Sequence, residues 1–142
     1  MHFFDASALT KQYVEEAGSD LARHLIATSD VAVSRLSAVE VPSALHRMRR
    51  EERFSEEQCA LMIDTMVDAF GHWRIVDLGP EVVAVARQVL ARHALRAGDA
   101  VQLATAVVLE RQVDRSLDAF VVFDHRLAAA ARAENLNVIG VE

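Results

Sequence analysis

Several residue types are scarce in this 142-residue sequence, and each scarcity excludes a class of site. A single cysteine, Cys59, allows neither an internal disulfide nor a zinc site built from cysteines. The only lysine, Lys11, lies outside any Gly-Lys-Ser/Thr signature, which excludes a Walker A phosphate loop. The same scarcity of lysine disfavours Schiff-base chemistry. The two prolines and five glycines occur singly, so we find no linker, repeat or low-complexity run.

Positive charge and long apolar runs are lacking as well. The 15 Lys+Arg residues are outnumbered by 21 Asp+Glu residues, which gives a net charge of -6 and disfavours nucleic-acid binding by bulk positive charge. The richest apolar stretch, residues 100–109, is shorter than the roughly 18 residues that a membrane helix needs. The first residues show no basic segment followed by an apolar core, so we expect no signal peptide and a soluble, cytoplasmic protein.

The residues that are present indicate a folded protein. Apolar residues make up 52% of the chain and charged residues 25%, which is typical of a globular domain and excludes disorder. At this length we expect a single domain spanning residues 1–142.

Short apolar segments alternate with longer helical patterns along the chain. This alternation predicts an α/β fold with a short, mostly parallel central sheet of about five strands flanked by helices. The expected strands are residues 2–4, 31–34, 74–78, 119–123 and 137–141. The expected helices are residues 8–14, 19–28, 37–53, 56–73, 81–93, 99–111 and 125–134.

Four acidic residues stand at comparable points in this pattern. Asp5, Glu40 and Asp124 each follow an expected strand, so a parallel sheet should bring them to one edge. Asp99 follows a helix instead, and the pattern alone does not bring it to that edge. If the acids converge, their mutual repulsion favours a bound divalent cation, and Mg²⁺ or Mn²⁺ chemistry on a phosphate ester follows.

Each acid also has a purely structural interpretation. Asp5 and Asp124 are suited to cap the helices that follow them by accepting backbone hydrogen bonds. The segments Ser37-x-x-Glu40 and Asp99-x-x-Gln102 have the spacing of a capping box. For any one acid taken alone, the cap is the better interpretation.

Four segments together resemble one known family. The chain is similar to PIN-domain ribonucleases, and most closely to the VapC toxins of VapBC toxin–antitoxin pairs. The segments that carry this resemblance, in order, are FFDASALTKQYVEE, SRLSAVEVPSALHR, LRAGDAVQLATAVVLE and FVVFDHRLAAAARAENLNVI.

The resemblance implies an acidic quartet, a PIN-like fold and a nearby hydroxyl. The family's acids fall on Asp5, Glu40, Asp99 and Asp124, and the hydroxyl falls on Ser7. Members often carry Thr or Ser two residues before the last acid, where this chain has Val122. Asp118 is interpreted as a strand-edge or capping residue, with substitution for Asp124 as a minor alternative.

The implied activity is endoribonuclease cleavage, in which water activated by Mg²⁺ or Mn²⁺ hydrolyses RNA phosphodiester bonds. Asp5 and Asp99 are the first candidates for metal ligands, while Glu40 and Asp124 ligate directly, act through water or orient the nucleophile. The implied partners are RNA, a VapB-like antitoxin and a second copy of the chain in a homodimer.

Arginines beside the acids are candidates for contact with RNA phosphates. Arg96 and Arg126 flank matched acids and are the preferred candidates. The basic segment 46–53 is interpreted first as a solvated helix face with ion pairs to Glu51 and Glu52, and RNA contact is its alternative.

Two other functions remain open at this stage. A phosphotransfer or phosphatase-type domain also carries an acid after its first strand, but it needs a second nearby acid and a well-placed lysine. A catalytically silent interaction domain would use the acids only as caps.

Overall fold

The computed structural model describes residues 1–141 as a five-stranded sheet between two groups of helices. Every strand pair is parallel, and the strand order is β3-β2-β1-β4-β5. The predicted fold class is therefore confirmed. The strands are β1 (His2–Phe4), β2 (Val31–Ser34), β3 (Arg74–Val76), β4 (Ala119–Val122) and β5 (Val138–Gly140).

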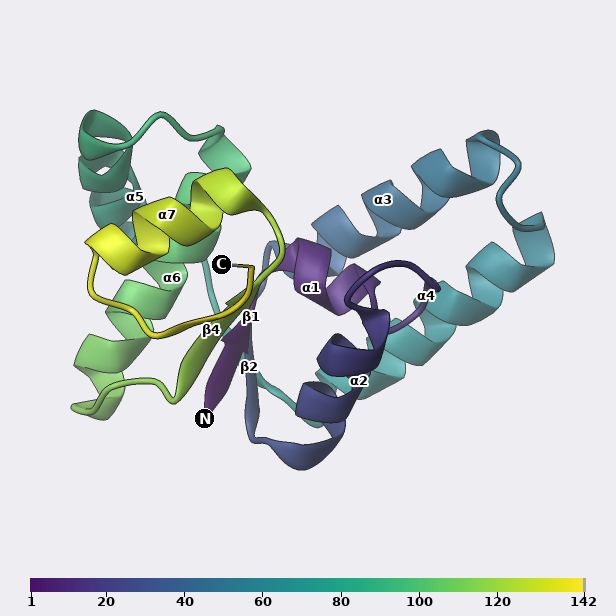
Figure 1. Cartoon of the computed structure of the whole chain (residues 1–142), viewed down its shortest axis with the longest axis horizontal. Coiled ribbons are helices and arrows are strands. Elements are labelled where there is room, and N and C mark those ends of the chain that lie inside the picture. Colours follow the sequence, from purple (N-terminus) through teal and green to yellow (C-terminus); the bar gives the residue numbers. More distant parts are fainter. Residues whose placement is uncertain (142) are drawn as a thin grey trace.

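Seven helices in the described residues cover the two faces of the sheet. Figure 1 shows α5, α6 and α7 on one side of the strands and α1 to α4 on the other. The helices are α1 (Ala6–Thr10), α2 (Ser19–Thr28), α3 (Ser37–Arg50), α4 (Glu56–Phe70), α5 (Pro80–Arg92), α6 (Ala97–Val113) and α7 (His125–Ala133). Helices α3 and α4 form an arm that extends away from the sheet (Figure 1).

The alternation of side chains along β1 divides the interior into two cores. Phe3 is fully buried against α5, α6 and α7, and its ring stacks on Phe120 with 5.6 Å between ring centroids. Phe4 is fully buried in the opposite core beneath α1, α3 and α4. Because both faces of the sheet are covered, the strands are predominantly apolar.

Several predicted boundaries were wrong by a few residues. The first helix begins at Ala6, not at residue 8, because Asp5 caps it. The helix expected over 99–111 begins two residues earlier and extends to Val113. The third and fourth strands end at Val76 and Val122, which shortens both relative to the prediction. In the part of the chain described, no helix is long and apolar enough to span a membrane.

Candidate active site

A cavity of about 540 Å³ opens at the edge where β1, β2 and β4 end. All four predicted acids line it, so the structure brings together residues from four separate helix starts. Ser7, which carries the predicted hydroxyl, and Arg96, a predicted phosphate contact, line it as well. The complete lining is Asp5, Ala6, Ser7, Thr10, Val39, Glu40, Ser43, Ala44, Arg47, Arg96, Asp99, Gln102 and Asp124.

Asp5 lies directly after β1, where its side chain has two roles. It caps α1 by accepting a 2.8 Å hydrogen bond from the Ala8 backbone N–H, as predicted. The Ser7 hydroxyl lies 2.9 and 2.8 Å from the two carboxylate oxygens and donates to them. Burial nevertheless raises the pKa of Asp5 to about 7, and the nearby charges of Asp99 and Glu40 add to the rise. A carboxyl in this position is stabilised when a cation approaches.

Glu40 lies in the first turn of α3, which follows β2. The predicted capping box is wrong here, because α3 has Leu36 at its N-cap and no side-chain cap. Glu40 instead accepts a 2.9 Å hydrogen bond from the side-chain amide of Gln102. Burial raises the pKa of Glu40, and the charge of Asp99 acts in the same direction.

Asp99 is the acid that the strand pattern could not place. Its predicted cap role is wrong, since α6 begins at Ala97 with Arg96 as its N-cap. Helix α6 packs against β2 and α7, which brings its first turn to the edge where the strands end. Burial and the charge of Asp124 raise the pKa of Asp99, while Arg96 opposes the rise.

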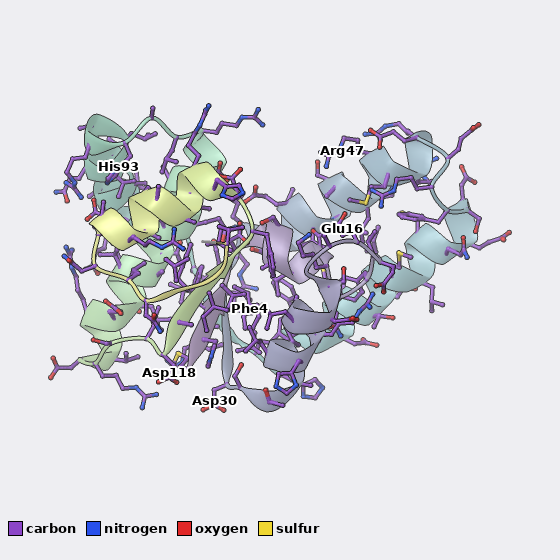
Figure 2. The ribbon with its side chains drawn as sticks, in the orientation of Figure 1. Phe4, Glu16, Asp30, Arg47, His93 and Asp118 are labelled. Carbon is purple, nitrogen blue, oxygen red and sulfur yellow. The ribbon has the colours of Figure 1, made fainter. Side chains whose placement is uncertain are left out.

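Asp124 follows β4 and caps α7 by accepting a 2.8 Å hydrogen bond from the Leu127 backbone N–H. The predicted cap is thus confirmed, and the residue still lines the cavity. Asp118 precedes β4 and pairs with the N-terminal ammonium group at the other end of the sheet. Figure 2 shows Asp118 far from Arg47, which lines the cavity, so Asp118 does not substitute for Asp124.

The arginines around the cavity differ in part from the prediction. Arg126 is exposed and is absent from the cavity lining, whereas Arg47 lines it. Arg47 lies two helical turns after Glu40, so a 3.6-residue period would have found it on the same face. The preferred ion pairs of segment 46–53 were also wrong, because Arg49 pairs with Glu56 at 3.4 Å and Arg53 lies 3.9 Å from Glu16.

The donor set of the cavity fits a divalent cation that keeps much of its water. Within residues 1–141, no three acidic, histidine or cysteine side chains are arranged to enclose a metal ion by themselves. Mg²⁺ commonly takes only one or two carboxylates and retains several waters. Four carboxylates around one cavity, with raised pKa values at three of them, provide such oxygens and an excess of negative charge.

The fold and this edge of acids define the class of protein. Residues 2–133 match the family model of the PIN domain, and the chain belongs to the PIN-domain family. Within that family, relatives along nearly the whole chain are VapC ribonucleases of Mycobacterium tuberculosis. Ribonuclease VapC49 of strain H37Rv is 36% identical over 137 residues, which cover 96% of this chain and 92% of the relative. Ribonuclease VapC47 of strain CDC 1551 is 31% identical over 137 residues, with 93% and 90% covered.

Solved structures have the same fold at low sequence identity. VapC20 of M. tuberculosis, described as a sarcin-ricin loop cleaving toxin, matches with a TM-score of 0.67 and 19% identity over 92% of this chain and 95% of its own. FitAcB of Neisseria gonorrhoeae matches with a TM-score of 0.70 and 14% identity over 99% and 97%. At these identities the similarity establishes the fold.

Proposed function

We propose that this protein is a metal-dependent endoribonuclease and the toxin of a type II toxin–antitoxin pair. The observation that carries the proposal is the convergence of Asp5, Glu40, Asp99 and Asp124 on one cavity of a PIN domain. The names of the VapC relatives supply the substrate class, which is RNA.

The chain's own residues divide the work of binding and orientation. Asp5 and Asp99 would hold a divalent cation such as Mg²⁺ or Mn²⁺, and the Ser7 hydroxyl, which donates to the Asp5 carboxylate, orients it. Glu40 and Asp124 would contact the cation directly or through water, or would orient the attacking water. When bound, the cation supplies an activated water and charge stabilisation for the transition state of phosphodiester hydrolysis.

Two arginines place positive side chains in the lining of this otherwise acidic cavity. Arg47 and Arg96 line the cavity with exposed side chains that are suited to bind phosphate oxygens in a bidentate manner. Arg126 stays a candidate only for RNA that extends beyond the cavity. The acidic balance of the whole chain then limits binding of RNA in the absence of metal.

The phosphotransfer alternative lacks its lysine. Lys11, the only lysine, donates to Glu16 at 3.0 Å and to the Ala17 carbonyl at 2.7 Å, and it also lies over the Phe123 ring. It is absent from the cavity lining. A covalent aspartyl phosphate after incubation with acetyl phosphate would nevertheless favour that function over ours.

The silent-domain alternative requires every acid to be a cap. Asp5 and Asp124 are caps, but Glu40 and Asp99 cap nothing in the structure. Helix capping therefore explains Asp5 and Asp124 but does not explain why Glu40 and Asp99 are acidic.

The proposed partners follow from the same family. A small antitoxin would cover the acidic edge and suppress cleavage, and two copies of the chain would form a homodimer. Co-expression with the neighbouring reading frame, followed by co-purification and light scattering, tests both.

The direct test is cleavage of a labelled single-stranded RNA by the purified protein. We expect cleavage with Mg²⁺ or Mn²⁺, none with EDTA, and products that carry 5′-phosphate ends. Undiminished cleavage in EDTA, or intact RNA at every metal concentration, would contradict the proposal.

A further inference from the structure

Gln102 is a buried polar residue that none of the proposed roles explains. Its side chain is 1% exposed in α6, one turn beyond Asp99, and it lines the acidic cavity. Its amide nitrogen donates to the Ser37 hydroxyl at 3.0 Å and to Glu40 Oε1 at 2.9 Å. Both partners lie more than 60 residues earlier in the chain, in α3.

The stability of the fold does not by itself favour glutamine at this position. Gln102 Oε1 is buried and accepts no hydrogen bond from the residues that the structure describes. An unsatisfied buried carbonyl is unfavourable, and an apolar side chain of similar length would avoid it. The advantage of glutamine at this position must therefore come from the hydrogen bonds that its amide nitrogen donates to Ser37 and Glu40.

A second residue of α6, Gly98, lies against the same carboxylate of Glu40. A Cβ placed on Gly98 would lie 3.2 Å from Glu40 Oε2, which is tighter than an ordinary contact, and 3.7 Å from the carboxyl carbon, which is an ordinary contact. Gly98 and Gln102 are four residues apart and so lie on one face of α6. That face of α6 contacts both carboxylate oxygens of Glu40. Gln102 donates a hydrogen bond to Oε1, and Gly98, which has no side chain, leaves room for Oε2.

We infer that Gln102 is a positioning residue for Glu40, and that Gly98 and Gln102 together form a seat for its carboxylate. With Oε1 held by the amide, Oε2 is the oxygen that no donor in residues 1–141 occupies, and it is left for the cation or its water. The seat couples α3 to the first turns of α6, which also carry Asp99. This inference rests on the proposed function for its catalytic consequence, but the seat itself is tested without catalysis.

The central experiment is a double-mutant cycle between Gln102→Met and Glu40→Ala. Methionine keeps the volume of glutamine and removes the donor. We expect Gln102→Met to lower kcat and Mn²⁺ affinity by about 10–100-fold, because this is the usual effect of losing a residue that orients a metal ligand. The KM for RNA should stay unchanged. In the Glu40→Ala background the same change should have almost no further effect. Equal losses in both backgrounds would overturn the inference, because Gln102 would then act independently of Glu40.

Gly98→Ala provides a variant that does not weaken the helix. Alanine favours the helix over glycine, so α6 should be at least as stable, while the added Cβ displaces Glu40 Oε2. We expect lower kcat and weaker Mn²⁺ binding without a lower melting temperature. Unchanged kcat and Mn²⁺ binding would show that Gly98 takes no part in the seat.

Thr105→Val is the matched control on the same helix. Thr105 is 1% exposed, and its hydroxyl donates to the Val101 carbonyl of its own helix, away from the cavity lining. We expect its kcat and Mn²⁺ affinity to equal those of the unsubstituted protein. Losses as large as those of Gln102→Met would show that any buried polar group of α6 has this effect, and would overturn the inference.

Hydrogen exchange of the Gln102 side-chain amide tests the seat without RNA or metal. Nuclear magnetic resonance should show slow exchange in the unsubstituted protein and faster exchange in Glu40→Ala. Identical rates in the two proteins would overturn the inference even if the protein proves to be a ribonuclease. Conversely, slow exchange that depends on Glu40 would uphold the seat even if RNA cleavage is never observed.

Discussion

Acidic residues at the two ends of the parallel sheet have pKa values that are shifted in opposite directions. At the end where the strands begin, Asp118 accepts a hydrogen bond from the N-terminal ammonium group, which holds its pKa below the ordinary value. At the other end, Asp5 is buried with the half-buried Glu40 and Asp99 beside it, and the pKa values of all three are raised. The carboxylate at one end is paired within the protein, whereas burial and the repulsion of neighbouring acidic charges raise the pKa values of the three carboxylates at the other end.

This difference shows that an acidic side chain next to a strand is not enough to place a residue in the candidate active site. Asp118 and Asp124 lie six residues apart on either side of β4, and both carry a carboxylate. Only Asp124 stands where the strand ends and a helix begins, beside the carboxylates of other chain segments. The direction of the strand therefore decides which acid belongs to the site.

The largest expected effect separates the two ends by activity. We expect Asp5→Asn or Asp99→Asn to reduce RNA cleavage by at least about 100- to 1,000-fold, because each change removes charge that holds the cation at the reacting phosphate. Cleavage rates at saturating Mn²⁺ measure the loss, and Asp118→Asn serves as the matched control with full activity. Near-normal cleavage by both Asp5→Asn and Asp99→Asn would refute the site.

The pH dependence of stability should also distinguish the ends. The pKa of Asp5 is about 7 in the folded protein and 3.8 in the reference state, so the unfolded chain releases this proton at lower pH than the folded protein does. Without metal, the free energy of unfolding should fall as the pH rises from about 4 to about 7, by up to about 4 kcal/mol. Urea unfolding across this range measures the slope, and it should be much flatter in Asp5→Asn. An equal slope in both proteins would argue that Asp5 ionises normally.

Divalent cations should stabilise the folded protein by binding at the end of the sheet that carries Asp5, Glu40 and Asp99. Mn²⁺ at 100 times its dissociation constant should raise the free energy of unfolding by about 2.7 kcal/mol, because it binds the folded state alone. Thermal unfolding with and without Mn²⁺ measures the gain, which Asp99→Asn should reduce and Asp118→Asn should retain. A gain of the same size in Asp99→Asn would place the cation elsewhere.

The smallest effect is expected at the end of the sheet that carries Asp118. Asp118 is exposed, and exposed ion pairs contribute little because water and salt screen them. Asp118→Asn should leave both the melting temperature and RNA cleavage essentially unchanged. A clear loss of cleavage in this variant would break the distinction between the two ends of the sheet.

The sequence by itself determined the fold class and most of the acidic edge. Apolar strands alternating with helical patterns require a parallel sheet, and parallel strands end at a common edge, so Asp5, Glu40 and Asp124 converge. These inferences depend on local periodicity and chain direction, which a sequence displays directly. The capping roles of Asp5 and Asp124 were predictable for the same reason.

Only the tertiary structure decided how Asp99 and Gln102 join that edge. The position of α6 depends on packing against α5, α7 and β2 within the core that contains Phe3, and no local pattern encodes it. Sequence spacing gave Gln102 a cap role with Asp99, whereas the structure pairs it with Glu40, 62 residues away. Contacts of this kind form when buried polar groups find partners across elements, so they emerge only once the helices are packed.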